Sequence, residues 1–174
     1  VKYFQYGVMY FMLPVFITLQ LALAWQIHKY ASSASEAVSV MSLLGATLSA
    51  ALWAGLGIIY GHELSHNKKE GFFVSRLIMA LSGASHFTYA HVYNHHLDLG
   101  HEDDPATAPR GRNVYAHAWH SHMGQSHYSY DMEAKKAKRQ EKPFINLNNR
   151  WLVGYLFSLP TLVLFIWAGG LWGI

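Results

Sequence analysis

The stretch AVSVMSLLGATLSAALWAGLGIIY, residues Ala37 to Tyr60, contains no Asp, Glu, Lys or Arg. Two further stretches, Phe4 to Ile27 and Trp151 to Ile174, are equally free of these residues. Each stretch has 24 residues. A helix of that length is about 36 Å long, enough to cross a hydrocarbon layer roughly 30 Å thick. The sequence therefore predicts an all-α integral membrane protein with three transmembrane helices.

The composition of the whole chain agrees with this prediction. Of its 174 residues, 52% are hydrophobic and 13% are charged, which is too apolar for an ordinary soluble domain. The chain has no Cys, which excludes disulfides, thiolate metal sites, iron–sulfur clusters and cysteine nucleophiles. The net charge of +3 comes without any nucleic-acid motif, so no nucleic-acid partner is expected. We expect one membrane-embedded domain over residues 1–174.

Basic side chains are distributed unevenly around the expected spans. Lys29 is the only one in the short loop over residues 28–36, whereas many others, including the cluster from Lys135 to Lys142, flank the opposite ends of the spans. By the positive-inside rule, the long polar segment from Gly61 to Asn149 is cytoplasmic.

Two further helices are expected within this polar segment. The stretch from Phe72 to Ala90 is apolar, but Arg76 interrupts it, and a full crossing would separate the histidines on its two sides. It is therefore expected to lie in, or dip into, the membrane interface. The stretch from Asp131 to Gln140 is expected to form a charged helix at the cytoplasmic surface, ended by Pro143.

Histidine is the informative residue type of the polar segment, which holds eleven of the twelve in the chain. The motif GHELSH, Gly61 to His66, places two imidazoles four residues apart on one helical face. The motif HVYNHH, His91 to His96, repeats that spacing, and its last ring is rotated by about 100° on an α-helix. Imidazoles clustered at a membrane edge are costly unless they bind a metal ion. The predicted ligands are His62, His66, His91, His95 and His96.

The HELSH motif fits two kinds of enzyme. In a zinc metalloprotease of the H-E-x-x-H type, Glu63 would be the general base. In an oxygenase, Glu63 would instead accept an N–H from a ligand imidazole and fix its tautomer. The second histidine motif is not explained by a protease, so an oxygenase is preferred, with the intramembrane zinc protease as an alternative. A metal carrier without enzymatic activity is a third class.

The remaining histidines are not expected to bind the metal. His28 is expected to be a satisfied core residue or an exposed one. His101 is expected near the centre, and His86 should face the interfacial helix. The rings of His120 and His122 would point about 200° apart on a helix. Exposure is the preferred interpretation for these residues: His117, His120, His122 and His127.

Two segments resemble the histidine boxes of bacterial membrane alkane hydroxylases. GHELSHNKK (61–69) resembles the first box, and SHFTYAHVYNHHLDLGHEDDPATA (85–108) resembles the second box with the segment that follows it. The position of Asp104-Pro105-Ala106-Thr107 points to the alkane and xylene monooxygenase branch of the fatty-acid desaturase superfamily. The resemblance covers roughly Gly61 to Leu152.

The resemblance implies a non-haem di-iron centre on the cytoplasmic side of a six-helix protein in the bacterial inner membrane. It also implies that the terminal methyl of an alkane, or a related apolar substrate, is hydroxylated with O₂ and with electrons from a rubredoxin-type donor. A desaturase-type oxidoreductase is an alternative. The later histidine motifs of that family lie beyond the end of this sequence, so we expect a truncated chain that is inactive by itself.

Overall fold

The computed structural model describes residues 2–32, 38–67 and 69–170, with side chains from Tyr6 onward. Every regular element in these ranges is helical, which confirms the all-α prediction. The three long helices are α1 (Lys2–Ala31), α2 (Val40–Ser65) and α7 (Arg150–Gly169). Each is long and apolar enough to cross a membrane, so the chain is a membrane protein. Residues 33–37, from the expected first loop and second span, and residues 171–174 of the expected third span lie outside the described residues.

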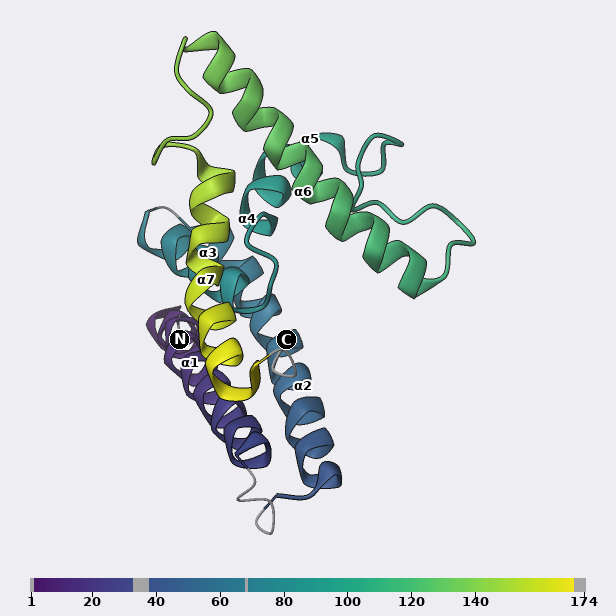
Figure 1. Ribbon diagram of the computed structural model, residues 1–174. Coiled ribbons are helices and arrows are strands. Elements are labelled where there is room, and N and C mark those ends of the chain that lie inside the picture. Colours follow the sequence, from purple (N-terminus) through teal and green to yellow (C-terminus); the bar gives the residue numbers. More distant parts are fainter. Residues whose placement is uncertain (1, 33–37, 68, 171–174) are drawn as a thin grey trace.

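Helix α1 packs against both α2 and α7 (Figure 1), and α3 (Glu70–Leu81) contacts all three. The buried core of this arrangement consists of Met12, Phe16, Leu64 and Ile78, contributed by α1, α2 and α3. The outer face of α2 carries large exposed apolar side chains, as a helix surrounded by lipid does. These are Leu44, Leu48, Leu52, Trp53, Leu56 and Ile59.

Gly57 allows α1 and α2 to approach closely. A Cβ atom on Gly57 would lie 1.8 Å from Cε2 and 1.9 Å from Cζ of Phe16, which is far inside van der Waals contact. On the same helix, a Cβ on Gly55 would have no atom within 4 Å.

We expect Gly57→Ala to destabilise the protein by about 1–3 kcal/mol, because the buried Phe16 ring or the whole helix must move. The measurement is unfolding of the purified protein in mild detergent. The matched control is Gly55→Ala, which adds the same methyl group to open space and should be neutral or stabilising by up to about 1 kcal/mol. Equal stability of the two variants would contradict this packing.

The single interfacial helix expected over residues 72–90 is interrupted. Helix α3 ends at Leu81, Gly83 takes a φ of 76°, and α4 (Phe87–Ala90) follows. Glycine adopts this left-handed conformation without the steric cost of a Cβ. The Ala84 N–H then donates to the Met79 carbonyl at 2.8 Å, which closes the end of α3. The chain therefore reverses, and the second histidine motif returns to the end of α2.

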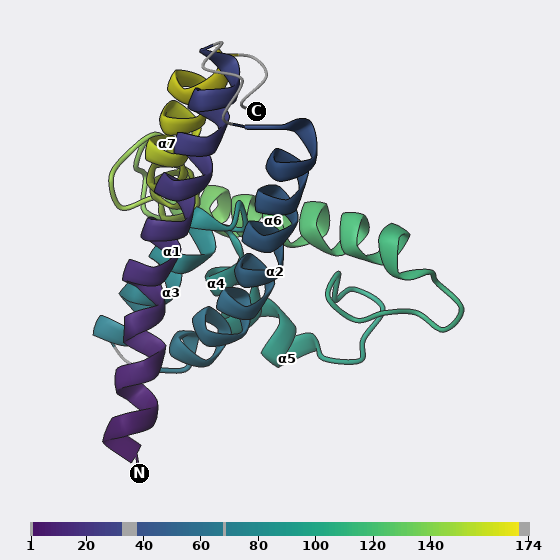
Figure 2. The same ribbon diagram turned by 90° about the horizontal axis from the view of Figure 1, so that it is seen from below.

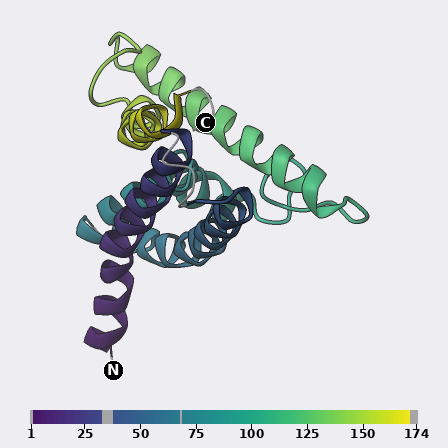
Figure 3. The same ribbon diagram turned by 60° about the horizontal axis from the view of Figure 1, so that its bottom comes forward.

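The charged helix expected over Asp131–Gln140 is the last part of a longer helix, α6 (Val114–Arg139). Its N-cap is Asn113, whose side-chain oxygen accepts a hydrogen bond from the Ala116 N–H at 2.9 Å. Helix α6 crosses beside α4 and α7 (Figures 1 and 3). Its buried residues are polar and four residues apart, so apolar periodicity could not reveal the face on which this helix packs. We call them the polar stripe of α6: Gln125, Ser129 and Glu133.

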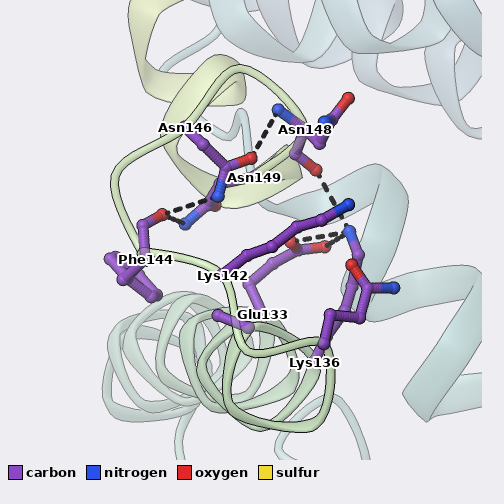
Figure 4. A pocket seen from close by; sticks show the side chains of 9 residues that line it. Glu133, Lys136, Lys142, Phe144, Asn146, Asn148 and Asn149 are labelled. Carbon is purple, nitrogen blue, oxygen red and sulfur yellow. Dashed lines mark hydrogen bonds and ion pairs between the residues drawn. The ribbon is translucent and has the colours of Figure 1, made fainter.

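A hydrogen-bonded turn joins α6 to α7 (Figure 4). The Lys136 ammonium pairs with the buried Glu133 carboxylate at 2.9 Å and donates to the Asn148 carbonyl at 3.1 Å. Asn149 donates from Nδ2 to the Phe144 carbonyl at 2.8 Å, and its side-chain oxygen caps the start of α7. These contacts fix α6 relative to the apolar helix α7.

Candidate metal centre

Five histidines from two segments meet at the end of α2. His62 lies on the last turn of α2 and His66 caps it, while the second group lies on a π-helical turn (His91–His95) and on α5 (His96–Asp98). The Nε2 atom of His91 lies 3.0 Å from Nε2 of His96 and 3.4 Å from Nε2 of His66. The ring centroid of His91 lies 4.3 Å from that of His62 and 5.4 Å from that of His95.

The π-helical turn changes the geometry expected for the second motif. The segment expected to be α-helical, with His96 rotated by about 100° to reach a neighbouring position, is a π-helical turn in the structure. In the π turn the His96 N–H bonds to the His91 carbonyl five residues back, so these two imidazoles face each other. His95 turns instead towards Asp104. Single π turns inside helices occur frequently at functional sites.

Buried polar contacts connect the two histidine-bearing segments. The Ser75 hydroxyl on α3 donates to the Gly61 carbonyl at 2.6 Å and lies 3.1 Å from the Thr88 hydroxyl. Gly61 directly precedes His62, and the ring of Phe87, next to Thr88, stacks on His91 at 5.1 Å. Helix α3 therefore holds both motifs in place.

Two carboxylates contact the clustered imidazoles. Oε1 of Glu63 lies 3.1 Å from Nδ1 of His62, and the Glu63 side chain is 52% exposed. Oδ2 of Asp104 lies 2.7 Å from Nδ1 of His95, and the Asp104 side chain is 0% exposed. An Nδ1–H that donates to a carboxylate leaves the Nε2 lone pair free for a metal ion.

Asp104 is the residue of this site that sequence reasoning missed. It also accepts hydrogen bonds from the Thr107 hydroxyl and, at 3.0 Å, from the Ala106 N–H. Burial raises the pKa of the Asp104 carboxyl, but the bonds from Thr107, Ala106 and His95 outweigh it, so the pKa lies below its usual value. The sequence signal for Asp104 is the Asp-Pro-Ala-Thr segment, which carries the family resemblance but does not by itself indicate a contact with His95.

The clustered imidazoles are suited to metal binding. The pKa of His91 is lowered to about 3, mainly by burial and then by the nearby imidazoles of His62, His96, His66 and His95. The pKa of His96 is also lowered, by burial first and then by His66 and His95. Neutral imidazole is the form that binds metal. Nitrogens about 2.0–2.1 Å from one ion lie about 3 Å from each other, as the Nε2 atoms do here. The donor set suits iron, copper or zinc.

The other described histidines lie outside this cluster. His28 stacks on Trp167 with ring centroids 4.8 Å apart. His86 is buried against the ring of His122, and burial, followed by His122, lowers its pKa to about 4. His101 is exposed and pairs with a neighbouring aspartate. The side chains of His120, His122 and His127 are exposed, as expected. The side chain of His117, which was also expected to be exposed, is half-buried.

A cavity of about 660 Å³ opens beside the cluster. His66 and His96 lie on its wall together with Phe72, Tyr89 and Arg150. The cluster is therefore accessible to a small molecule with both apolar and polar surface.

Comparison with known proteins defines the class. The fatty acid desaturase family model matches residues 38–174, so the chain belongs to this family. The chain is similar to alkane 1-monooxygenase 1 of Alcanivorax borkumensis, with 28% identity, and to alkane 1-monooxygenase of Pseudomonas putida, with 26%. Each match covers 82% of this chain and 34% of the relative.

A third relative, alkane 1-monooxygenase 1 of Pseudomonas aeruginosa, is 30% identical over 68% of this chain and 31% of its own length. The family predicted from the histidine boxes is thereby confirmed. The chain spans about a third of the length of these curated relatives.

Proposed function

We propose that this chain supplies five histidine ligands to a non-haem di-iron centre in a membrane monooxygenase. The whole enzyme would hydroxylate the terminal methyl of alkanes or related apolar substrates with O₂. The observation that supports this best is the convergence of both histidine motifs at one end of α2. The ligands are His62, His66, His91, His95 and His96.

The bound iron, the two carboxylates and the cavity have separate roles in this proposal. Terminal C–H bonds resist acid–base and nucleophilic side chains, and bound iron supplies the activation of O₂. Glu63 and Asp104 hold His62 and His95 in the tautomer that binds metal. The cavity beside His66 provides space for the substrate.

We place the centre on the cytoplasmic side of the bacterial inner membrane, because the basic residues flank that end of the spans. An apolar substrate partitions into the lipid and reaches the centre from the membrane. Electrons come from a soluble donor of the rubredoxin type, as the family resemblance implies.

Two other activities, a desaturase and a zinc protease, can be distinguished from the proposed oxygenase. A desaturase-type reaction on a fatty acyl chain is favoured by the family model that the chain matches. A zinc protease would need Glu63 as a base, whereas its carboxylate contacts Nδ1 of His62. The oxygenase therefore accounts for more of the site than the protease.

The test uses the full-length protein in lipid nanodiscs. We expect an iron content that matches a di-iron centre and a primary alcohol formed from an alkane when O₂ and reductant are supplied. A double bond formed in a fatty acyl substrate, without any alcohol from alkanes, would replace the proposal by the desaturase. Bound zinc together with peptide cleavage that Glu63→Gln abolishes would replace it by the protease.

A further inference from the structure

The first half of α6 directs its large apolar side chains outward. Tyr115 is 85% exposed and Trp119 70%, and Val114 and Met123 are exposed as well. Because residues four apart share a helical face, Tyr115, Trp119 and Met123 line up along α6. We call Val114, Tyr115, Trp119 and Met123 together the aromatic face of α6. A helix on the surface of a soluble domain has the reverse arrangement, so this face is built for a partner other than water.

The place of this face in the fold favours the lipid surface as that partner. The polar stripe of α6 begins only at Gln125, and the turns before it project sideways beyond α1 and α2 (Figures 2 and 3). Helices α1, α2 and α7 are long and apolar enough to cross a membrane, and the start of α6 lies closer to their level than its end does (Figure 1). A bilayer crossed by these helices would have its surface near the projecting start of α6.

The chemistry of the face agrees with its place. Trp and Tyr are enriched at membrane–water interfaces, where an apolar ring with a polar edge suits the headgroup region. Arg110 and Arg112 are exposed directly before the helix starts. Such cations near the membrane surface attract anionic headgroups.

We propose that the aromatic face of α6 is a membrane-surface anchor, which inserts into the headgroup region of the bilayer that α1, α2 and α7 span. Arg110 and Arg112 bind the lipid phosphates beside it. Since α6 also packs against α4, the anchor fixes the depth of the segment that carries the second histidine motif. The proposal is independent of the metal and of the reaction.

The test uses site-specific fluorescent labels, for which a chain without cysteine is well suited. Tyr115→Cys and Trp119→Cys are made separately in the full-length protein, with any other cysteine replaced, and labelled with an environment-sensitive fluorophore. In nanodiscs with nitroxide-bearing lipids, we expect blue-shifted emission and several-fold stronger quenching than for Lys138→Cys. That control is exposed at the other end of the same helix.

Every outcome bears on the proposal. Quenching at positions 115 and 119 no stronger than at 138 overturns it. Blue-shifted emission without nitroxide quenching also overturns it, because the face is then covered by protein, either by another part of the full-length chain or by a second copy. Met123→Cys keeps both aromatic residues, and quenching is expected there too if either of the first two variants fails to fold.

The arginines are tested by lipid composition. Replacing phosphatidylglycerol by phosphatidylcholine should weaken the quenching of a label at position 123. In the Arg110→Gln, Arg112→Gln double variant the same exchange should change little. An equal lipid dependence in both proteins would remove the arginines from the proposed anchor.

Discussion

His91→Ala in the full-length protein is expected to abolish both iron binding and alkane hydroxylation. The His91 ring lies at the centre of the cluster: its Nε2 atom is 3.0 Å from that of His96 and 3.4 Å from that of His66, and the ring is 4.3 Å from that of His62. The loss should exceed the roughly 10 to 100-fold expected when only a partner of a ligand is changed. Iron per protein and alcohol formed from an alkane are the two measurements.

A change outside the cluster provides the control for this prediction. His120→Ala removes an exposed imidazole of α6, and iron content and activity should stay as in the unmodified protein. Because His91 is buried, its replacement also leaves a cavity, so His91→Gln is measured in parallel as a variant that fills more of the space. Full iron content and full activity in both His91 variants would rule out the proposed centre.

The second large effect is expected from Asp104→Asn, which should weaken metal affinity by about 10 to 100-fold. The buried carboxylate accepts hydrogen bonds from His95, Thr107 and the Ala106 N–H, and an amide offers one oxygen for these donors. At least one buried donor then loses its acceptor, and the His95 ring is no longer held in one tautomer. Metal titration and ¹⁵N chemical shifts of the imidazole report these two consequences separately.

Asp103→Asn is the matched control for this change, since that neighbouring carboxylate is 86% exposed and pairs only with the exposed His101 among the described residues. Glu63→Gln should fall at the lower end of the same range, because Glu63 is half-exposed and contacts a single imidazole, that of His62. Equal metal affinities of the Asp104→Asn and Asp103→Asn variants would show that the buried contact does not position His95.

Sequence patterns predicted the elements whose physics is local. The charge-free part of α2 from Val40 to Tyr60 is an example, because hydrocarbon offers no partner for backbone N–H and C=O groups that are not bonded within a helix. The histidine-rich motifs were equally visible, since two imidazoles four residues apart share one helical face. The all-α class and the three apolar helices were therefore predictable from local pattern, and the family was predicted from the resemblance of the motif segments to known histidine boxes.

The tertiary structure decided how these parts meet. The left-handed Gly83 reverses the chain, and the π turn at His91–His95 sets His96 against His91 and directs His95 to Asp104. The polar stripe of α6 has no apolar period, so its packing was hidden as well. In each case the conformation is stabilised by contacts between groups that only the folded chain brings together. Periodicity records which face of a helix avoids water, but not which carboxylate reaches which imidazole.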